Sequence, residues 1–357
     1  MGQYEVRLTA RDGTPHGTIP ADGLSYEHRL GGTGSASVRC RLDHPVISGI
    51  NRSNLDCWAT ELDVLRDEQP VFSGPVITPD GNGLDGTVAI TAASPLQWLT
   101  HRYVLRDLEH LQVDQADILT GLVAYAQDPV EKGPHADCRL LVDAPPTGVL
   151  RDRTYLGAER AQIATLVQQL ADVQDGFDLT VEHALAGTVV QRILRAHYPL
   201  AGVDVEVPLV LGRGLTSLTL KRPGDQLATR VLAVGNGEGS DQITAVAHAD
   251  PALEERYGVH ELPLSVTDVK EQATLQAHAD GELVVRQPPL LVVGASYRVS
   301  DAAPYDLCGL GDRVLVQADR GWLQLTERLR VIARRVTVAP SGTETIDLTF
   351  NTALEAA

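Results

Sequence analysis

The most prominent chemical motif in this chain is a glycine-rich loop of the kind that can hold a phosphate group. Gly235-Asn236-Gly237-Glu238-Gly239 follows an expected strand, which is where a dinucleotide-binding fold places its glycines. Ser240 stands in place of the third glycine of that fingerprint, and a strand rather than a helix is expected to follow. We therefore interpret 235–239 as the loop of a hairpin.

Two other motifs resemble metal sites without completing them. The segment 80–85 contains the aspartates and glycines of a calcium loop, but Leu84 stands where an oxygen ligand belongs and no closing glutamate follows. His260 and Glu261 begin the zinc-protease pattern, yet the second histidine is missing and Pro263 would break the helix. The segment 80–85 is better explained as a hairpin turn, and we assign no metal-binding residue.

Nucleophiles and acid–base pairs are equally incomplete. Ser35 lacks the flanking pattern of a nucleophile elbow. Carboxylates are abundant, but the sequence does not separate paired acids for sugar hydrolysis from a solvated acidic surface. The histidines lack ligand spacing and are expected at the surface or in satisfied hydrogen bonds, among them His101, His110, His248 and His278.

Three tryptophans could form a carbohydrate platform, but they are more typical of a barrel core or edge: Trp58, Trp98 and Trp322. No combination of residues stands out as an enzymatic site. We therefore assign no catalytic and no cofactor-binding residue, and we expect a protein that is not an enzyme and that needs no cofactor.

The elements that position these residues are mostly short β-strands. In the stretch 307–350, Ile346, Leu348 and Phe350 alternate with polar residues, as in a half-buried strand. Turn residues separate four such runs, at 313–317, 322–325, 329–338 and 345–350. This pattern predicts a small antiparallel barrel or sandwich.

A similar order of runs and turns occurs near the amino terminus, at 58–65, 71–78 and 87–92. The segments ELDVLRDEQPVFSGPVI…DGTVAITAA and RVLVQADRGWLQLTERLRVI…GTETIDLTF share this order, although they share few identical residues. We interpret the two stretches as related β-modules within one chain.

The intervening residues are expected to contain helices, at 115–127, 159–172 and 266–286. The first two combine with a strand at 139–142 and a hairpin within 177–196 into an α/β module. The predicted fold is mainly β with an α/β insert, an α+β fold with two similar small antiparallel β-barrel domains. The predicted domains are 1–102 for the first barrel, 103–205 for a helix-containing middle domain, 206–249 and 290–357 for the second barrel, and 250–289 for a small helical insertion.

Composition describes an acidic globular chain. Its 357 residues are 43% hydrophobic, and 47 acidic residues outnumber 30 basic ones for a net charge of −17. This length predicts two or three domains with a sizeable core. Such a chain is a poor candidate for gripping nucleic acid, because neutralising phosphates requires lysine and arginine. The acidity suits a surface past which nucleic acid slides, or it simply confers solubility.

The sequence shows no export or membrane signal. No apolar run reaches about 18 residues, so we expect no membrane span. The opening MGQYEVRLTARDG is typical of a strand and turn rather than of a signal peptide. The four cysteines form no CxxC pair and are expected to be reduced and buried, although Cys40 and Cys57 could pair if their strands do; the other two are Cys138 and Cys308.

Several segments resemble the minor tail proteins of long-tailed phages of actinobacteria. They are LTARDG…LSYEHRLGGTGSASVRCRLDHP, ELDVLRDEQPVFSGPV, TVAITAASPLQWL, SLTLKRPGDQLATRVLAVGNGEG, YGVHELPLSVTD and GLGDRVLVQADRGW. The resemblance spans nearly the whole chain and rests on diffuse patterns rather than on one diagnostic motif. Such proteins are similar to tail-tip hubs, the relatives of the central hub of contractile-phage baseplates and of type VI secretion spike hubs.

The resemblance implies a structural baseplate hub in which two similar barrels per chain arrange as a trimer into a ring with six-fold-like symmetry. The implied partners are two further copies of the chain, the distal tail protein or tail-tube ring, the tape-measure protein, tail-tip spike or fibre proteins, and DNA only in transit. The implied location is the virion tail tip, after assembly in the host cytoplasm. Larger relatives carry a peptidase or glycosidase domain after the hub, but only about seven residues follow Phe350, so we expect no lytic domain.

Two other functions stay open at this level. One is a tail-associated cell-wall hydrolase that uses dispersed acids or histidines, and the other is a carbohydrate-binding receptor module that uses Trp58 or Trp322. If the chain forms a ring, we expect the runs 58–78 and 311–338 to supply the contacts between copies.

Overall fold

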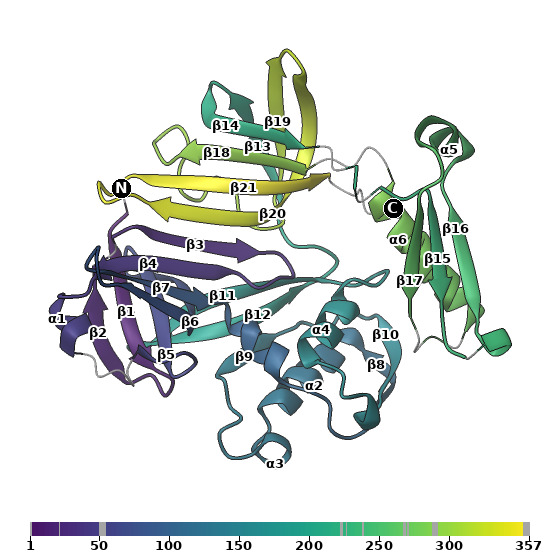
Figure 1. Ribbon diagram of the computed structural model, residues 1–357, viewed down its shortest axis with the longest axis horizontal. Coiled ribbons are helices and arrows are strands. Elements are labelled where there is room, and N and C mark those ends of the chain that lie inside the picture. The colour runs from purple at the N-terminus through teal and green to yellow at the C-terminus, as the bar shows by residue number, and fades with distance from the viewer. Residues whose placement is uncertain are drawn as a thin grey trace. The chain divides into compact units, whose positions relative to one another are not determined.

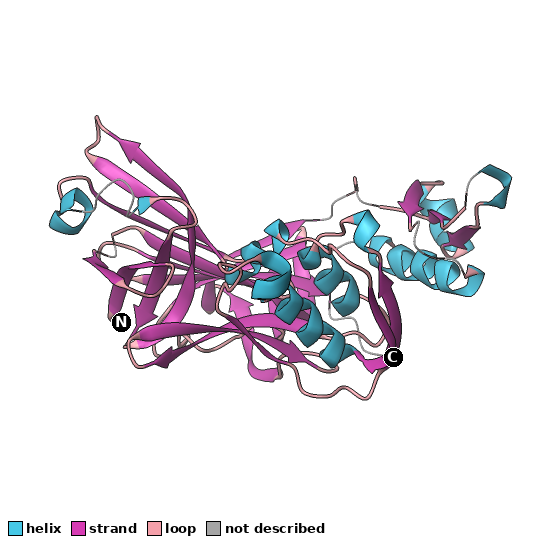
Figure 2. Ribbon diagram, turned by 90° about the horizontal axis from the view of Figure 1, so that it is seen from below, coloured by secondary structure: helices cyan, strands magenta, loops and turns pink. Residues whose placement is uncertain are grey.

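The computed structural model describes residues 2–20, 22–49, 55–221, 224–225, 227–237, 239–266, 269, 271–287 and 292–352. The chain forms two compact units, one made of Met1–Leu218 with Gly294–Ala357 and the other of Thr219–Val293. Strands dominate the larger unit, while helices gather in its middle segment and in the smaller unit (Figures 1 and 2). This architecture confirms the prediction of a mainly β, α+β fold.

Seven strands near the amino terminus form a curved sheet, here called the first barrel, whose two end strands do not pair with each other among the described residues (Figure 1). They are β1 (Tyr4–Ala10), β2 (Pro15–Ile19), β3 (Leu24–Arg29), β4 (Ser35–Arg41), β5 (Thr60–Arg66), β6 (Gln69–Asn82) and β7 (Thr87–Ala93). Neighbours follow the order β3-β4-β7-β6-β5-β1-β2. Successive side chains of a strand point to opposite faces, so Val88, Ile90 and Ala92 of β7 face the core together with Val38 and Cys40 of β4.

Six strands form the second barrel, which is closed. They are β13 (Asp204–Leu211), β14 (Gly214–Lys221), β18 (Val292–Arg298), β19 (Arg313–Arg320), β20 (Leu323–Val338) and β21 (Glu344–Thr352). Closure follows because β19 pairs with both β13 and β20 at the two ends of the strand order β13-β14-β18-β21-β20. Ile346, Leu348 and Phe350 point into the core as the alternation predicted.

The separate runs expected at 322–325 and 329–338 are wrong. Residues 323–325 and 329–338 both belong to the single 16-residue strand β20, and Trp322 lies in the turn that precedes it. The intervening Thr326, Glu327 and Arg328 include neither glycine nor proline, so nothing in them interrupts the strand.

The two barrels share their strand order. Strands β5, β6 and β7 form an antiparallel meander, and so do β19, β20 and β21. In the first barrel, β7 pairs with β4, and β4 pairs with β3. In the second barrel, β21 pairs with β18, and β18 pairs with β14. The first strand of each meander also has a counterpart partner: β5 pairs antiparallel with β1, whereas β19 pairs parallel with β13. The repeat inferred from the sequence is therefore a repeat of strand order.

Strand β20 also joins the barrels to each other. Its first half pairs with β19, and Ala333–Val338 pair antiparallel with Leu24–Arg29 of β3. Together the barrels therefore form one continuous 13-stranded sheet (Figure 1).

The middle segment contains most helices of the larger unit. Its elements are β8 (Leu108–Asp114), α2 (Gln115–Gln127), α3 (Pro129–Lys132), β9 (Leu140–Asp143), β10 (Leu150–Tyr155), α4 (Ile163–Ala171), β11 (Asp178–Ala186) and β12 (Val189–His197). Helix α2 begins where predicted, because Asp114 accepts a hydrogen bond from the Ala116 amide at 2.9 Å. Helix α4 begins at Ile163 rather than at Glu159, since Arg160 adopts the left-handed conformation with φ 51°.

The smaller unit pairs three strands with a helix. It contains β15 (Arg230–Val234), β16 (Thr244–His248), α5 (Pro251–Tyr257), β17 (Glu261–Ser265) and α6 (Gln272–Arg286). The sheet order is β16-β15-β17, and α6 covers the face that carries Val231 and Ala245. This differs from the expected boundary at 249, which placed β15 and β16 in the second barrel. Apart from that segment, the division at 102/103 and the other boundaries stay predictions.

Candidate assembly surfaces

The structure places the glycine-rich motifs in hairpin loops, as the sequence indicated. Strands β15 and β16 are antiparallel, and the Gly235 amide donates to the Ile243 carbonyl at 2.9 Å across the loop; Glu238 lies outside the described residues. Between β6 and β7, the Asn82 side chain accepts hydrogen bonds from the amides of Leu84 and Asp85 at 3.0 and 3.3 Å. Among the described residues, no group of three or more His, Cys, Asp or Glu side chains is placed to hold a metal ion.

The tryptophans do not form one platform. The rings of Trp58 and Trp98 stack edge to face at 4.8 Å, and His101 packs on Trp58 at the same distance. Trp98 is buried, whereas Trp322 lies at the tip of the β19–β20 hairpin and is 69% exposed. The three tryptophans therefore do not act together: Trp58 and Trp98 form one aromatic cluster with His101, and Trp322 lies on a different element.

All four cysteines are free thiols. Cys40, Cys138 and Cys308 are buried, but Cys57 is exposed, which corrects the expectation that all four are buried. Burial raises the pKa of Cys40 and of Cys138 to about 11 and that of Cys308 to about 12. Their thiols are therefore protonated and unreactive at neutral pH.

A buried carboxylate joins the two barrels beside the β3–β20 pairing. Glu344, at the start of β21, is 2% exposed. It accepts hydrogen bonds from Arg66 Nε at 2.7 Å and from the Tyr4 hydroxyl at 2.6 Å. Burial alone would raise the pKa of Glu344, but these donors hold it below its usual value. The Arg66 guanidinium also lies 3.9 Å from the centre of the Tyr305 ring, so the tip of the β5–β6 hairpin is fixed on the second barrel.

A second buried pair joins the first barrel to the middle segment. Arg192 of β12 and Glu61 of β5 are each 1% exposed and form an ion pair, and Arg139 binds the same carboxylate. Arg192 also donates to the Ser73 hydroxyl at 2.9 Å. Burial raises the pKa of Glu61, against the opposing effect of the two guanidinium groups.

Two further contacts complete the connection of the three parts. Arg330 of β20 pairs with Asp178 of β11, linking the second barrel to the middle segment. His28 of β3 and His183 of β11 lie with ring centres 6.0 Å apart beside a groove of about 420 Å³. Burial lowers the pKa of His28 to about 4 and that of His183 to about 3, so both are neutral at pH 7. None of these pairings is visible as a motif in the sequence.

Eight consecutive strands of the large sheet run through both barrels, in the order β14-β18-β21-β20-β3-β4-β7-β6. One face of this run covers the two cores. The opposite face carries the alternate positions, many of which are small polar residues: Ser25, Ser35, Ser37, Thr87, Thr91, Ser296, Thr337, Thr345 and Thr349. Because serine and threonine side chains are small and polar, they make this face hydrophilic without adding bulky groups.

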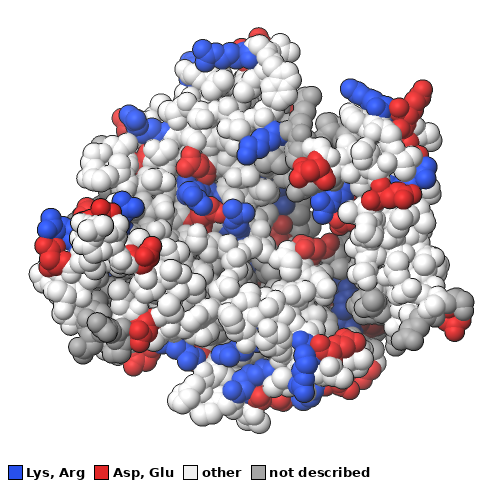
Figure 3. All heavy atoms as spheres, viewed as in Figure 1, with Lys and Arg blue, Asp and Glu red and all other residues white. Residues whose placement is uncertain are grey.

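The charges on this polar face are mostly basic. Its acidic residues are Glu27, Asp80 and Asp347, and its basic residues are Arg29, Arg39, Arg41, Lys221, Arg298 and Arg335. Glu27 pairs with both Arg29 and Arg335 across the junction of the barrels. The acidic excess of the chain therefore does not lie on this face. A role of that acidity in passing DNA, or in solubility alone, stays a prediction. On the face drawn in Figure 3, acidic and basic side chains are interspersed rather than gathered into a patch of one sign.

The eight-strand run ends in two strand edges. At one end, residues 78–82 of β6 pair with β7, and no described strand pairs with their other edge. At the other end, β14 pairs with β18, and its contact with β13 involves only Gly214 and Leu215 among the described residues. Unpaired edges of this kind are templates for strand pairing with another chain.

Comparison with known proteins gives matches in structure but not in sequence. No protein-family model and no curated protein matches the chain. A 43 kDa tail protein of prophage MuSo2 from Shewanella oneidensis superposes with a TM-score of 0.62 at 10% identity, covering 98% of both chains. The chain therefore has the fold of phage tail proteins.

Two further tail proteins share this fold. The tail protein from Neisseria meningitidis has a TM-score of 0.59 at 14% identity, covering 98% of this chain and 97% of its own. The prophage tail protein gp18 from Listeria monocytogenes has a TM-score of 0.56 at 12% identity, covering 98% and 95%. The resemblance to tail proteins seen in the sequence is thus confirmed for the fold. Because the sequence identities are so low, the resemblance in the sequence rests on diffuse patterns rather than on shared motifs.

The helices of this tail-protein fold are short. Within the described part of the chain, none is both long and apolar enough to cross a membrane.

Proposed function

We propose that this protein is a structural component of a phage tail, and that three copies close into a ring at the tail tip. The observation that carries the proposal is the repeat of strand order in two barrels joined directly by β3 and β20. A ring of three such chains contains six similar barrels, which is the symmetry needed to continue a hexameric tail tube.

The free strand edges supply the contact that closes the ring. Within the chain, β3 at the edge of the first barrel pairs with residues 333–338 of β20 in the second barrel. In the repeat of strand order, β14 is the counterpart of β3, and residues 78–82 of β6 are the counterpart of residues 333–338 of β20. A contact between β14 of one copy and β6 of the next is heterologous, and it closes into a ring when the rotation is one third of a turn.

Such a ring turns the polar face of the eight-strand run toward its bore. The serines and threonines of this face carry no charge, and Arg29 and Arg335 are paired with Glu27. The cations of the face that could contact the phosphates of passing DNA are therefore Arg39, Arg41, Lys221 and Arg298. The partners that follow are the distal tail protein or tail-tube ring above, spike or fibre proteins below, and the tape-measure protein and DNA in transit. The role is mechanical, and we propose no catalysis.

A mass measurement tests this function. Purified full-length protein, alone and with a tail-tube protein of the same phage, is examined by native mass spectrometry over a range of concentrations. We expect a species of three times the 38.3 kDa chain mass that grows with concentration. A chain that stays monomeric under all these conditions would overturn the ring.

A further inference from the structure

The two barrels carry equivalent hairpins with different tips. Strand β5 ends at Arg66 and β19 at Arg320, and each strand is followed by a two-residue turn. That turn is Asp67-Glu68 in the first barrel and Gly321-Trp322 in the second. Because the strand order of the barrels repeats, the two tips occupy corresponding positions.

The first of these hairpins acts as a clasp within the chain. Its tip crosses the β3–β20 junction, and Arg66 binds Glu344 and packs on Tyr305 of the second barrel. Glu344 directly follows the loop 339–343 between β20 and β21. The sheet contact between the barrels is thus reinforced by a hairpin tip seated near the β20–β21 loop.

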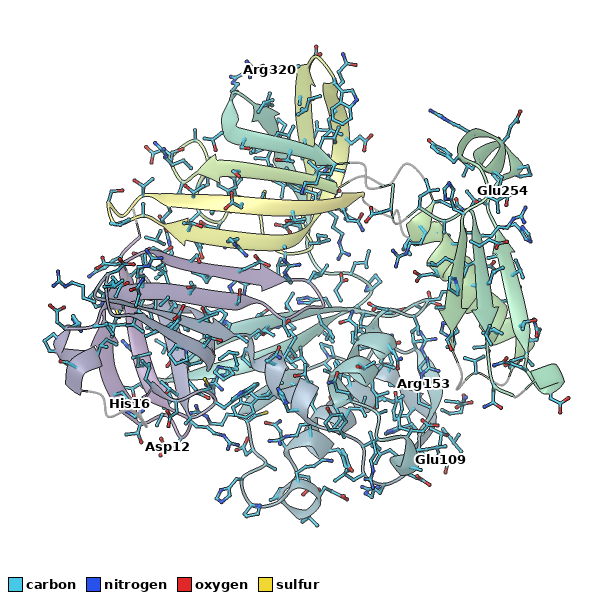
Figure 4. All side chains as sticks on the ribbon, viewed as in Figure 1. Asp12, His16, Glu109, Arg153, Glu254 and Arg320 are labelled. Atoms are coloured by element: carbon cyan, nitrogen blue, oxygen red, sulfur yellow. The ribbon has the colours of Figure 1, made fainter. Side chains whose placement is uncertain are left out.

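The second hairpin stands at the other end of the eight-strand run. It projects past β14, with Arg320 at its outer end (Figures 1 and 4). Trp322 in its turn is 69% exposed. A tryptophan and an arginine at a protruding tip are the residue types that most often dominate protein–protein binding.

The repeat also identifies what this tip would meet. The counterpart of the 339–343 loop is the loop 83–86 between β6 and β7, beside the free edge of β6. Leu84 in this loop is fully exposed, and Asp85 next to it offers a carboxylate. An exposed leucine and an aspartate match the tryptophan and the arginine of the hairpin in apolar character and in charge.

We propose that the β19–β20 hairpin of one copy clasps the 83–86 loop of the next copy, with Trp322 packed on Leu84 and Arg320 facing Asp85. The partner is a second copy of this chain, and the inference rests on the ring proposed above. It adds the residues that hold neighbouring copies together. Within one chain, the β3–β20 pairing and the Arg66 contacts join the two barrels. Between two chains, the β14–β6 pairing and this clasp would join neighbouring barrels in the same way.

The first test measures the strength of the ring. Trp322→Ala should raise the dissociation constant of the trimer at least about 30-fold, the effect of removing a residue that dominates an interface. Val130→Ala, which changes an exposed residue of the middle segment, is the matched control and should leave the constant unchanged. Both residues are at the surface, so circular dichroism should show native folding in each variant. A Trp322→Ala trimer as strong as that of the control would overturn the clasp.

The second test is cross-linking. An Asp319→Cys/Gly83→Cys variant in a Cys57→Ser background keeps Trp322 and Leu84 and places one thiol on the hairpin and one in the loop. Treated with a short bismaleimide, it should give covalent species of up to three chains, whereas each single variant should not. A trimer by mass that gives no cross-link would overturn the clasp and leave the ring standing. A monomer throughout would overturn both.

Discussion

The buried pair of Glu61 and Arg192 makes a sharp energetic prediction. Glu61 is 1% exposed in the native protein. Arg192→Met removes one of its two cationic partners and leaves Arg139 as the other, since the methionine side chain carries no charge. Removing one partner of a buried ion pair costs about 3–5 kcal/mol of folding free energy. The Ser73 hydroxyl also loses its donor. We expect a loss in this range, measured by urea unfolding at pH 8.

The pH dependence of this variant follows from the pKa of Glu61. Burial raises that pKa, and the loss of Arg192 raises it further because an opposing positive charge is gone. A carboxyl with a folded pKa above its unfolded value stabilises the fold at low pH and loses this contribution as pH rises through the folded pKa. The deficit of Arg192→Met should therefore be smaller at pH 5 than at pH 8.

Two further variants control for other causes. Glu61→Met/Arg192→Met replaces both charges by apolar groups and should recover most of the lost stability. Arg41→Met removes an exposed ion pair with Asp43 and should change nothing measurable. A loss below about 1 kcal/mol in Arg192→Met, or a loss equal at both pH values, would refute the reasoning, because both follow from a desolvated carboxylate.

Three other outcomes follow from the structure. Glu344→Gln should cost about 2 kcal/mol in urea unfolding, because Arg66 and Tyr4 lose a charged acceptor; an unchanged midpoint would contradict the junction described here. Maleimide should label Cys57 within minutes in native protein, while Cys40, Cys138 and Cys308 react only after unfolding; mass spectrometry of the labelled peptides decides this. Replacing 222–291 by a short glycine–serine turn should leave the β-sheet circular dichroism of the remainder intact, because β14 and β18 are neighbours; loss of that signal would show that the smaller unit is required for folding.

Local features of the fold could be read from the sequence, because neighbouring residues determine them. The alternation of Ile346, Leu348 and Phe350 predicted a half-buried strand, and Asp114 predicted the start of α2. Sheet membership was harder to predict. The apolar residues of β15 and β16 indicate strands but do not specify which strands they pair with, so the smaller unit was divided at the wrong place.

The junction between the parts could not be predicted, since it depends on residues far apart in the chain. Arg66 and Glu344 are 278 positions apart, and Glu61 and Arg192 are 131 apart. Each of these is an ordinary charged residue in its own segment, and only the folded chain brings them together. The expected ring-contact runs 58–78 and 311–338 stay a prediction; the free edge lies at the end of β6, at 78–82, and the protruding hairpin lies within 311–338.

We propose that two barrels of one strand order allow three chains to build a ring of six. Electron cryomicroscopy of the assembled protein, averaged without imposed symmetry, should show a closed ring with a threefold axis, six similar lobes around the bore, and β14 of each copy beside β6 of the next. A particle without a threefold axis, or one in which these two strands lie apart, would contradict it.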